Sequence, residues 1–142
     1  MPMFDVNYKL ATDIDVSADA NGADVSIAQG GTLEGLKSGM ICEGILQFDG
    51  AISDGNLDAT LFVYIEEKIG SNYRAIGVFP QLGTSADPNA TYASNGGELS
   101  CFFTPSFNAT ALRYRVDIGG TGGPVYNDMN IYVHPLNYAP TR

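Results

Sequence analysis

The chain has 142 residues, enough for one domain with a substantial hydrophobic core. Only 16% of the residues are charged, and 17 glycines accompany eight tyrosines and seven phenylalanines; this composition disfavours a helical bundle and favours strands. The net charge of −9 argues against nucleic-acid binding, and no apolar run approaches the roughly 20 residues of a membrane helix. The first six residues lack the basic and apolar regions of a signal peptide, so we expect folding in a cytosol.

The first strand pattern runs from Phe4 to Val16, with apolar residues at most even positions. This stretch of about thirteen residues is longer than a usual strand. Either it bends and serves two sheets, or its first part, residues 1–12, is an arm that lies on something outside the domain. Asn21-Gly22 then predicts a hairpin turn between residues 13–16 and 25–27.

The middle of the chain predicts two further strands and a hairpin. Residues 40–48 are apolar on both sides, which indicates a strand inside a sheet. Residues 57–66 alternate, with Leu57, Ala59, Leu61, Val63 and Ile65 facing inward, and residues 70–72 turn into a strand over residues 73–79. Residues 80–97 have loop composition and are long enough for a binding loop.

The last third contains the most regular alternation in the chain. Residues 98–104 predict a strand, and Leu112–Ile118 alternate without interruption before the glycine-rich residues 119–124 and a return strand over Met129–Val133. About eight or nine strands without a convincing helix predict an all-β fold, an antiparallel β-sandwich that is jelly-roll-like with extended terminal arms. A small barrel is the alternative. We expect one domain over residues 1–142, with a tail at 137–142.

Residues capable of catalysis or metal binding are few. His134 is the only histidine, and no nucleophile motif accompanies it. One histidine with the distant Cys42 and Cys101 does not make a zinc site, and both cysteines are expected to be buried and reduced. The aspartates between Asp13 and Asp24 do not have the spacing of a calcium loop. We therefore predict no catalytic residues, no metal and no cofactor.

Two charged pairs have plain structural interpretations. Adjacent strand residues point to opposite faces, so Glu66 and Glu67 do not form the paired carboxylates of a glycosidase by themselves. Arg113 and Arg115, partly offset by Asp117, are interpreted as a solvated strand face. The protein is predicted not to be an enzyme.

Aromatic residues suggest a surface for a partner. Phe62 and Tyr64 occupy the outward positions of their strand, which indicates either burial on both faces or aromatic surface reserved for binding. A free arm would expose an apolar stripe, which soluble monomers tend to avoid. The residues predicted to contact a partner are Phe4, Val6, Tyr8, Leu10, Tyr132 and Tyr138.

The chain resembles the decoration (cement) proteins of tailed-phage capsids in its acidic, glycine-rich composition and in three of its parts. These parts are residues 4–10, the sandwich over residues 13–133 and the tail over residues 137–142. The resemblance implies a viral structural protein at the virion surface, made in the host cytoplasm. It would form a homo-oligomer, bind the major capsid protein and stabilise the head shell. Neither nucleic acid nor a membrane would be a partner.

The closing strands, Leu112–Ile118 and Met129–Val133, also resemble jelly-roll carbohydrate-binding modules. That resemblance implies the alternative function, a carbohydrate-binding or receptor-binding module of a virion. Such modules usually present tryptophan platforms, and this chain has no tryptophan. Tyrosines such as Tyr92 or Tyr126 are the expected substitutes.

Overall fold

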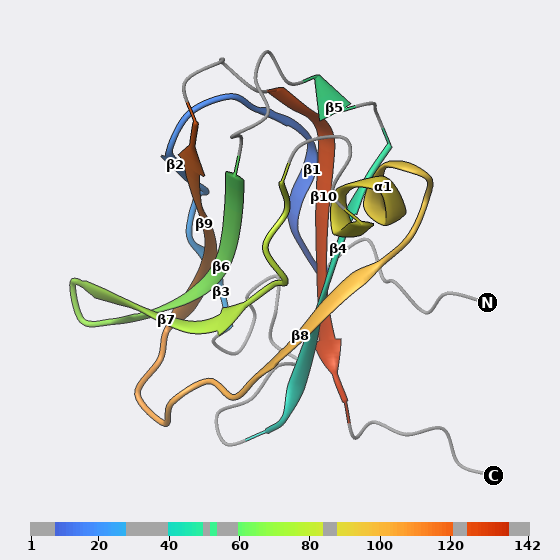
Figure 1. Cartoon of the computed structure of the whole chain (residues 1–142). Coiled ribbons are helices and arrows are strands. Elements are labelled where there is room, and N and C mark those ends of the chain that lie inside the picture. Colours follow the sequence, from blue (N-terminus) through green and yellow to red (C-terminus); the bar gives the residue numbers. More distant parts are fainter. Residues whose placement is uncertain are drawn as a thin grey trace, which may run out of the picture.

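The structure is a computed structural model of the whole chain, and it describes residues 8–27, 40–49, 52–53, 60–83, 88–120 and 125–136. Two antiparallel sheets pack face to face, which confirms the predicted jelly-roll-like β-sandwich (Figure 1). Sheet A has the strand order β1 (Lys9–Val16), β10 (Val125–Pro135), β4 (Cys42–Phe48) and β8 (Leu99–Phe103), with β5 (Ile52–Ser53) also paired to β10.

Sheet B has the order β2 (Ala20–Asn21), β9 (Ala111–Gly119), β6 (Thr60–Ile69) and β7 (Asn72–Val78), with β3 (Val25–Ser26) also paired to β9. The β6–β7 hairpin forms at the predicted turn, where Gly70 has a φ of 63°. The strands on either side of the glycine-rich residues 119–124 belong to different sheets. β9 lies in sheet B and β10 in sheet A.

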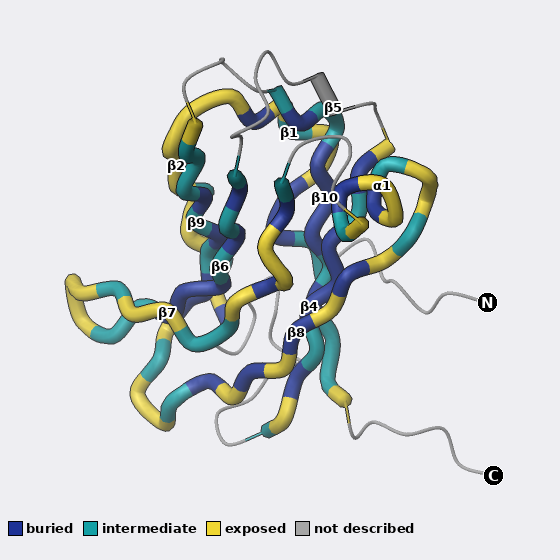
Figure 2. The backbone as a smooth tube through the Cα atoms, viewed as in Figure 1, coloured by how far each residue is buried: buried dark blue, intermediate teal, exposed yellow. Residues whose placement is uncertain are grey.

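The core lies between the two sheets (Figure 2), and β8 shows the period of two most clearly, with Leu99, Cys101 and Phe103 buried. Leu61, Val63 and Ile65 of β6 are buried, as the alternation predicted. Each large apolar side chain buried in this way contributes about 1.5–3 kcal/mol. Cys42 and Cys101 are buried and free, as predicted, and burial raises the pKa of these thiols to about 11 and about 12.

Two glycines let the sheets approach closely. A Cβ atom at Gly44 of sheet A would lie 2.6 Å from Ile65 Cδ1 of sheet B. A Cβ atom at Gly77 of sheet B would lie 3.2 Å from Cys101 Sγ and 3.3 Å from the Cβ of Phe103, both on β8. Any larger residue at these positions would therefore have to displace its neighbours.

The N-terminal strand is less regular than the predicted one over the residues that the structure describes. Asp13 has a φ of 52°, and its amide donates to Asn130 Oδ1 at 3.0 Å. The β1–β10 pairing accordingly shifts register around Asp13, and Leu10 and Ala11 are buried next to one another. The prediction of one unbroken alternation to Val16 is therefore wrong.

The predicted hairpin at Asn21-Gly22 is also wrong. β2 and β3, on either side of Gly22, both pair with β9 instead of joining β1 to β3. The Gly22 amide donates to the carbonyl of Tyr114 at 2.9 Å, and a Cβ at Gly22 would overlap the Tyr114 ring. The glycine is needed here for close approach to β9 rather than for a hairpin turn.

A short helix, α1 (Pro88–Ser94), lies within the segment predicted to be a loop, so the expectation of no helix is wrong. Its first residue is proline, and Gly96, with a φ of 89°, follows its end. Gly97 N donates to Tyr92 O and Gly96 N to Ala93 O, the hydrogen bonds of a Schellman cap. Helices this short lack an extended apolar period. Among the described residues, α1 is the only helix and is too short to cross a membrane.

Candidate functional site

Of the six residues predicted to contact a partner, the structure describes Tyr8, Leu10 and Tyr132. Phe4, Val6 and Tyr138 lie outside the described residues. The buried Leu10 packs in the chain's own core, so it is not available to a partner in this structure. Tyr8 is half-buried against the core.

Tyr132 is half-buried on the outer face of sheet A, with Lys9 Nζ 5.2 Å from its ring centroid. The roles of Tyr8 and Tyr132 in partner binding stay predictions. The two tyrosines proposed as sugar platforms also differ. Tyr92 is 54% exposed, whereas Tyr126 is fully buried and donates to Gly83 O, so a platform at Tyr126 is ruled out.

His134 lies on β10 and faces Glu43 of β4, with 3.0 Å between Nε2 and Oε1. Within the described ranges, no three residues among His, Cys, Asp and Glu are arranged to hold a metal ion.

The outer surface of sheet B gathers aromatic and charged side chains from three neighbouring strands. β6 and β9 pair in register from Thr60 to Lys68, and β7 pairs with the other edge of β6. Because alternate residues share one face of a sheet, the outward positions of these strands form one surface. We call this surface the sheet B face; its residues are Phe62, Tyr64, Glu66, Lys68, Tyr73, Arg113, Arg115 and Asp117.

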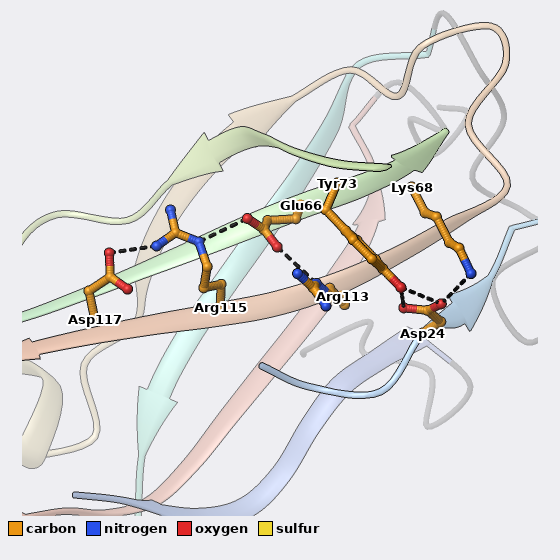
Figure 3. Close-up of polar contacts among 7 residues, drawn as sticks. All are labelled: Asp24, Glu66, Lys68, Tyr73, Arg113, Arg115 and Asp117. Carbon is orange, nitrogen blue, oxygen red and sulfur yellow. Dashed lines mark hydrogen bonds and ion pairs between the residues drawn. The ribbon is translucent and has the colours of Figure 1, made fainter. Parts of the chain in front are cut away.

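Glu66 holds two guanidinium groups at the middle of the sheet B face (Figure 3). Its Oε1 accepts from Arg113 Nε and its Oε2 from Arg115 Nε, each at 2.8 Å. Arg115 also donates from Nη1 to Asp117 Oδ2 at 2.6 Å. Only 8% of the Glu66 side chain is exposed, compared with 17% for Arg113 and 30% for Arg115. The carboxylate is therefore covered while the arginines reach solvent.

Both arginines also stack on tyrosine rings. The Arg113 Cζ atom lies 3.4 Å from the Tyr73 ring centroid, and the Arg115 Cζ atom lies 4.1 Å from that of Tyr64. Hydrogen bonds to Asp117 and Glu66 raise the pKa of Arg115 above its ordinary value, although burial opposes the shift. Each guanidinium is thus fixed both in its plane and along its normal.

The network continues to the far end of the sheet B face. The Tyr73 hydroxyl donates to Asp24 at 2.8 Å, and Lys68 Nζ lies 3.0 Å from Asp24 Oδ2 (Figure 3). The hydrogen bond from Lys68 is the main cause of the lowered pKa of Asp24.

Phe62 and Tyr64 supply the aromatic part of the face. Their ring centroids are 6.3 Å apart and their planes differ by 24°. Both residues are half-buried, so part of each ring is in contact with solvent. They lie on β6 directly opposite Asp117 and Arg115 of β9.

Tyr64 also borders a shallow groove of about 520 Å³ between the edge strands β7 and β8. A bulge in β7 opposite Ile65 and Glu66 bends the strand at this point. Across the sheet, Arg115, Tyr64 and Val78 are register partners, so one row leads from β9 to the groove. The groove is lined by Tyr64, Ala75, Ile76, Gly77, Val78, Cys101 and Phe102, of which Val78 and Phe102 are more than half exposed.

On the opposite side of β6, the carboxylate of Glu67 has different partners. Glu67 is fully buried and accepts from Ser106 N at 2.7 Å, Ser106 Oγ at 2.6 Å and Arg74 Nη2 at 2.8 Å. Burial opposes the ionisation of Glu67, but these hydrogen bonds outweigh it and lower its pKa. Glu66 and Glu67 therefore do face opposite sides, as the sequence predicted.

The sequence interpretation of Arg113 and Arg115 as a solvated face missed their shared acceptor. Alternation alone predicted that Phe62, Tyr64 and Glu66 face outward together, and that the two arginines share a face with Asp117. It did not predict that β6 pairs with β9, which places Glu66 opposite Arg113. The alternation within each strand indicates which residues face outward, but it does not indicate which strands pair.

The solved structures that are similar to this chain include three carbohydrate-binding proteins. The C-terminal family 22 carbohydrate-binding module of Clostridium thermocellum Xyn10B is 10% identical over 96% of this chain and 99% of that chain, with a TM-score of 0.48. The N-terminal CBM22-1–GH10 modules of C. thermocellum endo-1,4-β-D-xylanase Xyn10B, complexed with xylohexaose, are 10% identical over 95% of this chain and 30% of that chain, with a TM-score of 0.44. A xylan-binding domain from CBM 22 is 14% identical over 68% of this chain and 56% of that chain, with a TM-score of 0.38. No family model matches the sequence, and the search of curated proteins gives no match.

Proposed function

We propose that this chain is a non-catalytic carbohydrate-binding module that takes a glycan chain on the sheet B face. The observation that carries the proposal is the Phe62–Tyr64 ring pair beside the fixed guanidinium of Arg115. A sugar ring presents apolar C–H groups that pack on aromatic rings, and hydroxyl groups that accept hydrogen bonds from planar donors. Ligand sites commonly combine apolar area with a few fixed polar groups in this way.

The rigid polar groups favour binding because little order has to be imposed when a ligand arrives. Arg113 and Arg115 are long side chains that would ordinarily lose rotamer freedom on binding. Here Glu66 and the two tyrosine rings already hold them. Preorganised donors give more of their interaction energy to the complex.

The groove beside Tyr64 extends the surface in the direction across the strands. A ligand that lies on Arg115 and Tyr64 would next meet Val78 and then Phe102. This length suits several linked sugar units better than a single monosaccharide. The groove adds apolar contact area, while the sheet B face adds the hydrogen-bond donors.

Affinity electrophoresis and calorimetry against a panel of soluble polysaccharides, including glucans, xylans, mannans and pectins, test the proposal. We expect at least one polysaccharide to bind, and the Tyr64→Ala variant to lose most of that binding. Tyr132→Ala is the matched control, because Tyr132 is also half-buried beside a cation but lies on sheet A. Absence of binding across the panel, or equal loss in both variants, would contradict the proposed site.

The capsid-decoration function is the second candidate. Ile41 and Leu136 are 51% and 42% exposed, and Leu136 N donates to Ile41 O, so two apolar side chains are presented together at one end of sheet A. If the protein has this second function, we propose that it lies on the outer surface of a virion. Sedimentation of the protein with capsids that lack it, compared with its Ile41→Ser variant, tests this role. Failure of the wild-type protein to sediment with the particles would exclude it.

A further inference from the structure

Charge on the sheet B face is balanced when Asp24, which pairs with Lys68 at its edge, is included, unlike the charge of the chain as a whole. The cations Arg113, Arg115 and Lys68 meet the carboxylates of Glu66, Asp117 and Asp24 in four ion pairs. The whole chain, in contrast, has a net charge of −9. A ligand on the face therefore meets hydrogen-bond donors without an excess of positive charge.

The geometry of Glu66 determines which donor atoms remain available. It accepts from the Nε atoms of both arginines, which turns their outer Nη atoms away from the carboxylate. Among the described residues, Arg113 Nη1 and Nη2 and Arg115 Nη2 have no protein acceptor. These atoms are the donors that remain for a ligand.

The positive charges of these arginines are already neutralised by neighbouring carboxylates, so they attract an acidic ligand less. A carboxylate or sulfate near Arg115 would approach the negative charges of Glu66 and Asp117 as well as the guanidinium. At the effective dielectric of a protein surface, like charges a few ångströms apart repel strongly enough to decide between ligands. A hydroxyl group gains the same donors without this repulsion.

We infer that Glu66, supported by Asp117, determines specificity by selecting uncharged glycans and rejecting acidic ones. This inference rests on the proposed function of the sheet B face. Glu66 acts in two ways: it orients the two arginines and it neutralises them. The second role gives it an effect on selectivity that a purely structural residue would not have.

Matched ligand pairs separate the two roles. The probes are hydroxyethylcellulose with carboxymethylcellulose, and fully methyl-esterified pectin with polygalacturonate. We expect wild-type protein to bind the uncharged member of a pair at least about tenfold more tightly, which corresponds to about 1.4 kcal/mol. The Glu66→Gln variant keeps the shape of the side chain and should lose most of that ratio, and its binding to the acidic member should weaken as salt rises.

Two further variants provide a second test of the charge effect and a control for it. Asp117→Asn removes a charge from a side chain that is 42% exposed, and it should shift the ratio in the same direction by a smaller factor. Glu98→Gln removes an exposed charge that precedes β8, away from the sheet B face, and should leave the ratio unchanged. Thermal melting of each variant checks that it is folded.

The outcomes distinguish the two proposals. Tight binding of the acidic members by wild-type protein, or an unchanged ratio in both Glu66→Gln and Asp117→Asn, overturns the specificity inference and leaves the proposed function standing. Binding of neither member of any pair by the folded wild-type protein overturns the proposed function, and the inference with it.

Discussion

The outer and inner sides of strand β6 carry adjacent glutamates in very different surroundings. Glu66 faces outward and binds two arginines whose outer nitrogen atoms stay exposed. Glu67 faces inward, where Ser106 donates to both of its oxygen atoms and Arg74 to one of them. The same chemical group thus orients donors on one side and fastens the segment before β9 on the other.

The difference shows how the partners of a buried carboxylate determine what it does. Ser106 binds Glu67 with its backbone amide, so the contact fixes the path of the chain between β8 and β9. Arg113 and Arg115 bind Glu66 with side chains that have several donors each, so binding one acceptor leaves others free. We therefore expect Glu67 to matter mainly for stability and Glu66 mainly for ligand selection.

Replacing Glu67 with glutamine should have the largest effect on stability. The variant loses charge-assisted hydrogen bonds to Ser106 at a buried position, which should lower the free energy of unfolding by about 1.5–3 kcal/mol. Glu66→Gln should cost less, about 1 kcal/mol, because glutamine keeps one side-chain oxygen as an acceptor and Arg115 keeps Asp117. Urea denaturation measures both values. A larger loss for Glu66→Gln would reverse the assignment of the two roles.

The pH dependence of stability should show the contribution of Glu67 to the folded state. The pKa of Glu67 is lowered in the folded state, so its contribution to stability is present above its unfolded pKa of about 4.3 and is lost as the pH falls through the folded value. We expect the urea midpoint of the wild type to fall more steeply below about pH 5 than that of Glu67→Gln. Asp24, whose pKa is also lowered, should give the same slope in both proteins. Parallel pH profiles would show that Glu67 does not contribute as described.

Replacing Arg74 with alanine should have the smallest effect, about 0.5 kcal/mol in the free energy of unfolding. Although Arg74 pairs with Glu67, its own side chain is 67% exposed, and Ser106 continues to bind the carboxylate. The measurement is urea denaturation beside Ser106→Ala, which should cost more. A larger loss for Arg74→Ala than for Ser106→Ala would mean that the ion pair contributes more to stability than the Ser106 hydroxyl contact.

Strand positions and faces could be predicted because they depend on local alternation. Leu61, Val63 and Ile65 point inward as predicted, and Glu66 and Glu67 point to opposite sides. Strand pairing is not local, and so the meeting of Glu66 with Arg113, which is 47 positions away along the chain, was not predicted. The site depends on that pairing, whereas the fold class does not.

Two of the three local errors, the hairpin at Asn21-Gly22 and the missed helix α1, have a similar cause. Asn21-Gly22 has the composition of a hairpin turn, but the glycine is used where the chain passes the Tyr114 ring. Helix α1 was missed because its buried residues are the small Ala90 and Ala93, whose spacing gives a weak apolar signal. In both cases tertiary contacts decided between uses that the local sequence allowed.

The close contact at Gly77 lies where the two edge strands border the groove. Gly77 lines the groove on β7 and faces Cys101 and Phe103 on β8, so its missing side chain lets the two edge strands lie near one another. A single methyl group at this position would press on Cys101 Sγ and the Cβ of Phe103, and β8 would have to move away by a few tenths of an ångström. Gly77 is therefore a position at which one substitution changes the spacing of β7 and β8 at the groove, while the sequence of the sheet B face stays the same.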